Sequence, residues 1–432
     1  MLDDDTVRYL LIAAAAQHES VATTVRLAAA SPADRLAVLR VLVDDDLRTR
    51  RFLGYRQSID WANDAAPVVE ALCAEAAASP SRELLALVER AVSHVVKVIL
   101  KADDSAGTIG DLARDLLGIH ERLCDSGVAD PAALARWMVK FGCDDQDFFT
   151  VDPVRYAEAL GDRGVQLFRA AIEKRPHTRE NEFAVKYATQ RLAILDGDAE
   201  RVVELLGGDL SSPHQFIRVA EAMLELQRPD DAVSWARRGI ESTTGWQVAQ
   251  LYEIVARDLE AAGHTADLLD LRREHHSRMA SASTYAALRQ AAIANDEWSS
   301  EIESARSILG ARDRGALVDV MLADGEIDEA WQLATSDNDW YAGDQRWSSL
   351  AEAREATNPA ASLGAYMRLV ESALRTADKH AYRAAVGYLK RARRAANAAE
   401  LSADLDDYIA SLRELHRRRP TLIEMLDKAG MR

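Results

Sequence analysis

The chain has 432 residues, of which 48% are hydrophobic and 28% charged, a composition that excludes a disordered tail, a fibre and a membrane-embedded chain. Glycine, with 21 residues, and proline, with 10, are both scarce, which disfavours a turn-rich β sandwich or barrel. With 53 basic and 70 acidic residues the net charge is −17, which excludes binding to nucleic acid by bulk attraction. The expected fold class is all-α.

The N-terminal residues carry no recognisable targeting pattern. Met1 is followed by a leucine and three aspartates, where a secretory signal needs Lys or Arg. The apolar run 9–16 is far shorter than the roughly 20 residues that cross a bilayer. Cys73, Cys124 and Cys143 form no Cys-x-x-Cys pair, which argues against a zinc site or a disulfide framework. We therefore expect a cytoplasmic chain with buried, reduced thiols, no metal and no cofactor.

Proline marks the expected helix starts. A cap side chain accepts a hydrogen bond from a free amide of the first turn, and proline at the next position already has the helical φ. Pro67 lies inside a periodic segment, where it is expected to kink or divide a helix. Six pairs fit the cap pattern: Ser31-Pro32, Ser79-Pro80, Asp130-Pro131, Asp152-Pro153, Ser212-Pro213 and Asn358-Pro359.

Residues 1–150 contain long amphipathic stretches without a fixed period. Two examples are Arg82 to Ala102 and Ile109 to Ser126, whose apolar residues recur at helical spacing. The polar segment 142–152 then interrupts this periodicity. The sequence therefore predicts an N-terminal α-helical bundle over residues 1–150.

A weak internal repeat follows in residues 151–432. Its turns lie 30, 36, 32 and 30 residues apart, a period typical of a helical solenoid. Two of the helices that follow these turns resemble tetratricopeptide half-repeats. Their small residues should allow close helix contact and their tryptophans should fill the remaining space. The turn anchors are Gly197, Gln227, Gly263, Asn295 and Gly325; the half-repeat residues are Ala232, Trp235, Ala236, Ala330, Trp331 and Ala334. The prediction is a tetratricopeptide-like α-solenoid that ends in basic helices.

Two parts of the chain resemble known bacterial sequences. The segments 52–72 and 101–112 are similar to a domain-of-unknown-function family, and the segments 382–389 and 408–420 are similar to the end of SWIM zinc-finger proteins. Those proteins place a Cys-x-Cys…Cys-x-His zinc module ahead of a long helical region. This chain has no Cys-x-Cys, so the resemblance implies the helical region without the zinc module or its contacts.

Four polar clusters could suggest chemistry, and each has a simpler interpretation. The stretch 103–105 lacks the ligand spacing of an EF-hand and is expected to cap a helix starting at Ser105 or Thr108. The acidic clusters 44–46 and 144–147 have no nearby histidine and are expected to be solvated, which leaves metal-dependent hydrolysis as the weakest hypothesis. His275-His276 cannot chelate jointly from adjacent helical positions and is expected at a polar helix end.

The C-terminal region has the opposite charge to the rest of the chain. Residues 375–432 contain 13 basic and 8 acidic residues. If 381–397 is a helix, the cations at positions 379, 383, 390 and 394 fall on one stripe when that helix is continued back to Lys379. Tyr382, Val386 and Leu389 then face the core. The candidate partner-binding residues are Lys379, Arg383, Lys390, Arg394, Arg417, Arg418 and Arg419. They either form a cationic ridge for phosphates or an acidic protein, or they pair with acids of the same chain.

No Gly-x-Gly-x-x-Gly, Walker or Gly-x-Ser-x-Gly motif occurs, so the usual means of nucleotide and acyl chemistry are missing. The leading hypothesis is a non-enzymatic cytoplasmic adaptor that binds a protein partner through its helical repeat. The alternative is an accessory protein that contacts nucleic acid through the basic patch. Four tryptophans would be informative if exposed, but each is expected in the core: Trp246, Trp298, Trp340 and Trp347.

Overall fold

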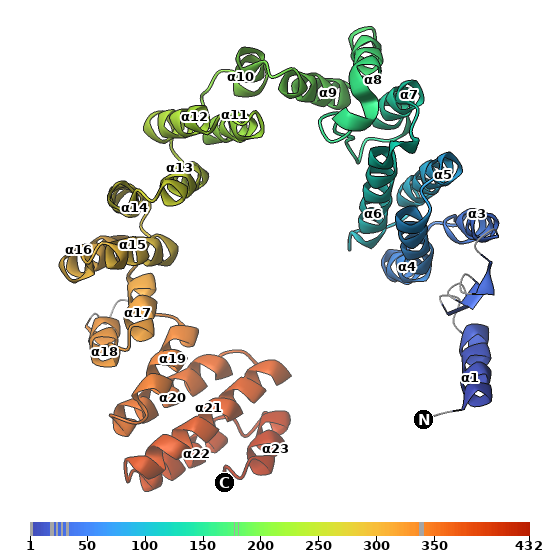
Figure 1. Ribbon diagram of the computed structural model, residues 1–432. Coiled ribbons are helices and arrows are strands. Elements are labelled where there is room, and N and C mark those ends of the chain that lie inside the picture. The colour runs from blue at the N-terminus through green and yellow to red at the C-terminus, as the bar shows by residue number, and fades with distance from the viewer. Residues whose placement is uncertain are drawn as a thin grey trace. The chain divides into compact units, whose positions relative to one another are not determined.

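The computed structural model describes residues 3–17, 21–22, 25–26, 29–31, 34–176, 178–179, 181–336 and 341–432. Every regular element in these ranges is helical (Figure 1). Their one isolated β contact is a parallel bridge between Leu53 and Ala102. The predicted all-α fold is therefore confirmed.

The first of two compact units comprises residues 1–211 and 218–232. Its apolar core runs without interruption from Leu39 to Leu192. The predicted boundary near residue 150 thus lies inside one continuous core, because the helices before and after it pack on each other. Its helices are α1 (Asp4–Gln17), α3 (Arg35–Asp46), α4 (Tyr55–Ala78), α5 (Arg82–Ile99), α6 (Thr108–Leu123), α7 (Pro131–Lys140), α8 (Ala157–Glu173), α9 (Glu182–Leu195) and α10 (Ala199–Gly207), with π turns η1 (Cys124–Val128) and η2 (Phe141–Asp145).

The second unit comprises residues 212–217 and 233–432, so the division falls within α11 (Pro213–Glu225) and α12 (Pro229–Ser242). From α13 to α22 each helix packs on the next, and α14, α15, α17 and α21 also contact the second helix after them. Consecutive packing of this kind is that of an α-solenoid. The further helices are α13 (Val248–Ala262), α14 (Thr265–Met279), α15 (Ala282–Ala294), α16 (Trp298–Arg312), α17 (Arg314–Ala323), α18 (Ile327–Thr335), α19 (Asp344–Arg354), α20 (Pro359–Leu374), α21 (Lys379–Ala398), α22 (Ser402–Leu415) and α23 (Pro420–Lys428).

One turn geometry recurs between the paired helices. At each turn a residue has positive φ, its N–H donates to the carbonyl three residues back, and the next N–H donates to the carbonyl five residues before it. This pair of hydrogen bonds is the Schellman motif, which satisfies the last free carbonyls of a helix. The left-handed residues are Gly197, Gln227, Gly263, Asp296 and Gly325. Four predicted anchors are confirmed, and the fifth lies one residue after Asn295.

The predicted half-repeat residues also lie where expected. Ala232, Ala236, Ala330 and Ala334 are all at most 2% exposed. Trp331 is half-buried and packs edge-on against Trp347 of the next helix, with ring centroids 5.4 Å apart. Small residues thus let the helices approach while tryptophan fills the space beside them.

Two proline caps form as predicted. Asp130 accepts a hydrogen bond from the Ala133 amide at 2.8 Å, and Asn358 accepts one from the Ala361 amide at 3.0 Å. The prolines at 131, 213 and 359 are the first residues of their helices. Pro32 lies outside the described residues.

Two predictions of a helix start at proline are wrong. α5 begins at Arg82 rather than at Pro80, because Ser81 provides the cap. α8 begins only at Ala157, because the Asp152 carboxylate accepts the Val154 amide within a turn. Pro67 does not divide α4, which is one helix whose residues before and after the proline are buried in the same core.

Two glycines in the second unit should respond oppositely to alanine. A Cβ on Gly239 would lie 2.7 Å from the Phe216 and Leu251 side chains, whereas Gly387 is exposed and has nothing within 4 Å. Gly239→Ala should lower the free energy of unfolding by about 1–3 kcal/mol through overpacking. Gly387→Ala should raise it by about 0.5–1 kcal/mol through helix propensity. Thermal unfolding of the two variants checks both signs, and a shift in the same direction would contradict this account.

Candidate functional site

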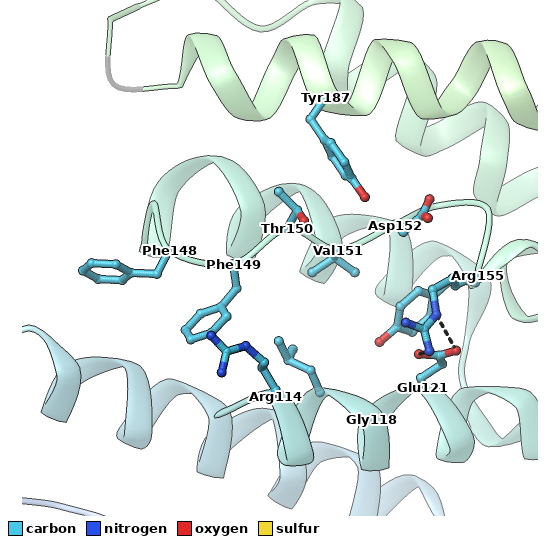
Figure 2. Close-up of a pocket in the computed structure, with 12 residues that line it drawn as sticks. Arg114, Gly118, Glu121, Phe148, Phe149, Thr150, Val151, Asp152, Arg155 and Tyr187 are labelled. Atoms are coloured by element: carbon cyan, nitrogen blue, oxygen red, sulfur yellow. Dashed lines mark hydrogen bonds and ion pairs between the residues drawn. The ribbon is translucent and has the colours of Figure 1, made fainter. Parts of the chain in front are cut away.

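A pocket of about 480 Å³ in the first unit lies among α6, the segment 148–156 and α9 (Figure 2). Figure 2 shows Tyr187 pointing from α9 toward Thr150 and Asp152. The Arg114 guanidinium lies 6.0 Å from the centroid of the Phe149 ring. Burial raises the pKa of Tyr187. The lining contains neither a histidine nor a cysteine.

The charges around this pocket neutralise one another. Arg155 pairs with Glu121 at 2.9 Å, and Arg191 pairs with Asp152 at 2.7 Å and with Glu225 at 2.6 Å. These pairs connect elements of the first unit, so the polar side chains are engaged in holding it together. Each charged side chain in these pairs already has an oppositely charged partner, so none of them is free to bind a charged ligand.

The arrangement closest to a catalytic one is buried beside the pocket. Cys124 Sγ lies 3.8 Å from His120 Nδ1, and His120 Nε2 lies 3.6 Å from Glu89 Oε1. Burial raises the pKa of Cys124 to about 12, so the thiol is protonated at neutral pH. Both residues are at most 1% exposed, and Trp137 stacks on the imidazole with ring centroids 3.9 Å apart. The group therefore packs the core and offers no accessible nucleophile.

The cysteines and acidic clusters have structural partners. Cys124 is buried as predicted, whereas the prediction of a buried Cys73 is wrong, since it lies on an exposed position of α4 and accepts an Arg122 N–H at 3.2 Å. Asp44 pairs with Arg90 at 2.6 Å. In the described part of the chain no three or more His, Cys, Asp or Glu residues gather as a metal would require.

The capping interpretation of 103–105 is confirmed at the helix start. α6 begins at Thr108, as predicted. The capping side chain belongs to Asp104, whose two carboxylate oxygens accept the Ile109 and Gly110 amides at 3.0 and 2.8 Å. The sequence interpretation placed the cap on Ser105 or Thr108 and missed the aspartate that reaches past them.

His275 and His276 lie at the C-terminal end of α14, as predicted, but the prediction that this end is polar is wrong, because both side chains are buried in the second unit. His276 has Nδ1 2.9 Å from the Thr284 hydroxyl and Nε2 2.9 Å from the Ala305 carbonyl oxygen. His275 stacks on Tyr252 with ring centroids 4.3 Å apart and planes at 6°. These partners come from α13, α15 and α16, so only the tertiary packing reveals that the pair is structural.

An apolar groove of about 570 Å³ lies between α15 and α17, the first helices of two successive pairs. Its α15 wall follows one helical stripe through Ala282, Ala286 and Ile293, which are all exposed. Its α17 wall contains Val320 and Ala323. Ile293 is 54% exposed, a large aliphatic side chain with no covering element.

Ion pairs brace the floor of this groove. Asp324 of the lining, whose side chain is 8% exposed, is held by Arg289 and by Arg306, the latter at 2.9 Å. Asp319 on the rim pairs with Arg346 at 2.9 Å. The fixed charges therefore position α15 against α17 and leave the aliphatic surface open.

The predicted cationic stripe lies on α21 with its expected faces. Lys379, Arg383, Lys390 and Arg394 are exposed, while the three apolar residues of the same helix are buried. Part of the larger patch is occupied by contacts within the chain. Arg394 lies 3.4 Å from Glu355, Arg417 pairs with Glu414, and Arg419 donates to the Leu374 carbonyl at 2.8 Å; Arg418 is exposed.

The tryptophans divide into three kinds. Trp347 is buried as predicted and Trp298 is half-buried. Trp246 is 77% exposed, so its predicted core position is wrong. It precedes α13 in a turn and lines none of the pockets described above. Trp340 lies outside the described residues.

Comparisons with known proteins identify no family for this chain. No protein-family model matches the chain, and none of the curated proteins matches it. The chain is similar to a solved structure described as a "Circular tandem repeat protein with novel repeat topology and enhanced subunit contact surfaces", with 16% identity over 91% of this chain and 96% of that chain, at a TM-score of 0.20. The α-solenoid assignment rests on the helix packing and the recurring turns. Over the residues described, no helix is long and apolar enough to cross a membrane.

Proposed function

We propose that this protein is an adaptor that binds a segment of a partner protein in the groove between α15 and α17. The observation that carries the proposal is the exposed aliphatic lining of that groove, with Ala282, Ala286 and Ile293 on one wall. An open apolar surface of this kind gains free energy when a partner covers it. The proposed action is binding rather than catalysis, in the cytoplasm as the sequence predicts.

Charge and length define the expected partner segment. The stripe from Ala282 to Ile293 spans about 16 Å at 1.5 Å per residue, which about five residues of an extended peptide would cover. The net charge of −17 favours a segment with positive charge by electrostatic steering. The proposed occupant is therefore a short segment with aliphatic side chains and flanking Lys or Arg.

The alternative, contact with nucleic acid through α21, has weaker support. Its candidate residues Arg394, Arg417 and Arg419 already contact Glu355, Glu414 and the Leu374 carbonyl. Three exposed cations remain on one stripe: Lys379, Arg383 and Lys390. A relation to the helical region of SWIM zinc-finger proteins stays a prediction of the sequence.

The groove can be tested with peptides selected from a random displayed library of about ten residues, a length that covers the stripe. The selected sequences should share aliphatic residues next to Lys or Arg. Ala286→Lys should weaken their binding by about tenfold or more, because it places a charged chain within an apolar interface. Isothermal titration of the full chain measures this loss.

The matched control is Ser299→Lys, an exposed position on α16 that makes the same change of charge outside the groove. Its peptide affinity should remain close to that of the original chain. Equal losses of peptide affinity in the two variants would mean that the added charge, and not its place in the groove, weakens binding. Selected peptides that bind the Ala286→Lys chain unchanged would refute the groove as the binding site.

A further inference from the structure

A second hollow, in the first unit, has the opposite character to the groove. It measures about 480 Å³ and lies where the C-terminal ends of α3 and α5 meet. Four cations line it: Arg48, Arg50, Lys97 and Lys101. All four are exposed, and none is within ion-pair distance of a carboxylate in the described parts of the chain. Such a concentration of free positive charge is unusual on a chain with a net charge of −17.

The acids of the hollow do not cancel these cations. Asp44 and Asp45 line it as well, but Arg90 from outside the lining already holds Asp44 at 2.6 Å. Asp45 is then the only acid of the lining whose charge can offset the four cations. A helix C-terminus carries only about half a negative charge, so the two helix ends account for roughly one of the cations. The remaining excess is positive.

The backbone on either side of the hollow is held in place. His94 Nδ1 lies 3.1 Å from the Val43 carbonyl oxygen, a hydrogen bond that joins α5 to α3. Val43 and Val98 beside it are at most 1% exposed and belong to the core of the unit. Lys97 lies in the last turn of α5, and the Leu53 amide donates to the Lys101 carbonyl at 3.0 Å, so the backbone at both lysines is tied to its neighbours. Arg48 and Arg50 lie in the segment between α3 and α4.

We propose that this hollow binds the phosphate group of a small phosphorylated ligand. Two arginines supply planar, bidentate donors and two lysines supply point charges, the combination that suits phosphate oxygens. A volume of about 480 Å³ is within the range of small-molecule sites. The site lies in the first unit and is independent of the proposed adaptor groove.

Inorganic pyrophosphate is the probe, titrated calorimetrically into the full chain at about 150 mM salt, where weak surface attraction is screened. The expected result is saturable binding of one pyrophosphate per chain. The double variant Arg48→Ala/Lys97→Ala should weaken this binding by roughly tenfold or more, because each removed contact is a charge-assisted hydrogen bond. Both positions are exposed, so the variant should keep the thermal stability of the original chain.

The control is Arg56→Ala/Lys186→Ala, which removes two exposed cations of the same unit that do not line the hollow. Binding that survives in the control and is lost in the first variant supports the site. Absence of saturable binding to the original chain overturns it. Equal weakening in the two variants also overturns it, since it would mean diffuse attraction.

Discussion

Arg306→Ala is expected to lower the free energy of unfolding of the second unit by about 3–5 kcal/mol. The Arg306 guanidinium donates to Asp324 at 2.9 Å, to Glu326 at 2.6 Å and to the Tyr285 hydroxyl at 3.3 Å. Burial disfavours its charge, but these hydrogen bonds outweigh burial and raise its pKa. Because the Asp324 side chain is only 8% exposed, removing the arginine leaves a buried carboxylate with Arg289 as its one cationic partner in the described residues.

Denaturant unfolding of the variant measures this effect, with Arg417→Ala as its control. Arg417 and Glu414 form an ion pair of the same charge, but their side chains are 64% and 70% exposed. Loss of such a surface pair should change stability by about 0.5 kcal/mol or less. A similar small loss in both variants would show that burial of Asp324 contributes nothing to the strength of its pairing.

Acid is expected to destabilise the second unit by about 3 kcal/mol through His275. Burial lowers the pKa of His275 to about 4, from 6.5 in an exposed histidine. Between these two pH values the unfolded chain therefore binds a proton that the folded chain does not. Stability should fall as the pH drops from about 6.5 to about 4 and should hold above this window.

The variant His275→Phe isolates this effect. Neither ring nitrogen of His275 has a hydrogen-bond partner in the described residues, and the ring stacks on Tyr252, so phenylalanine can keep the packing. The variant should lose about 3 kcal/mol less than the original chain over the same pH window. His264→Gln, at a position whose side chain is 61% exposed, should follow the original curve. Superimposable curves for His275→Phe and the original chain would assign the acid sensitivity to other groups.

The repeat was predictable because it depends on local sequence. A turn that needs positive φ favours glycine, and Gly197, Gly263 and Gly325 mark three of the five turns. At the fourth turn the sequence Asn295-Asp296 offers two residues that tolerate the left-handed conformation, and only the structure decides between them. Helical spacing likewise placed the α21 cations on one exposed stripe.

The sites were less predictable because they depend on residues far apart in the chain. The groove combines Ala286 with Ala323, and the basic hollow combines Arg48 with Lys97, across elements whose approach is set by packing. No local pattern distinguishes these exposed alanines or cations from others. The prediction for His275 was wrong for the same reason. Its polar neighbours in the sequence suggested a surface helix end, whereas Tyr252 stacks on its ring in the structure.

The most direct test of the adaptor proposal is hydrogen–deuterium exchange of the full chain with and without a selected peptide. Binding in the groove predicts slower exchange in α15 and α17, whose side chains form its two walls. The basic hollow between α3 and α5 and the stripe on α21 should exchange as before. Protection centred on either of those surfaces, with α15 and α17 unchanged, would contradict the account.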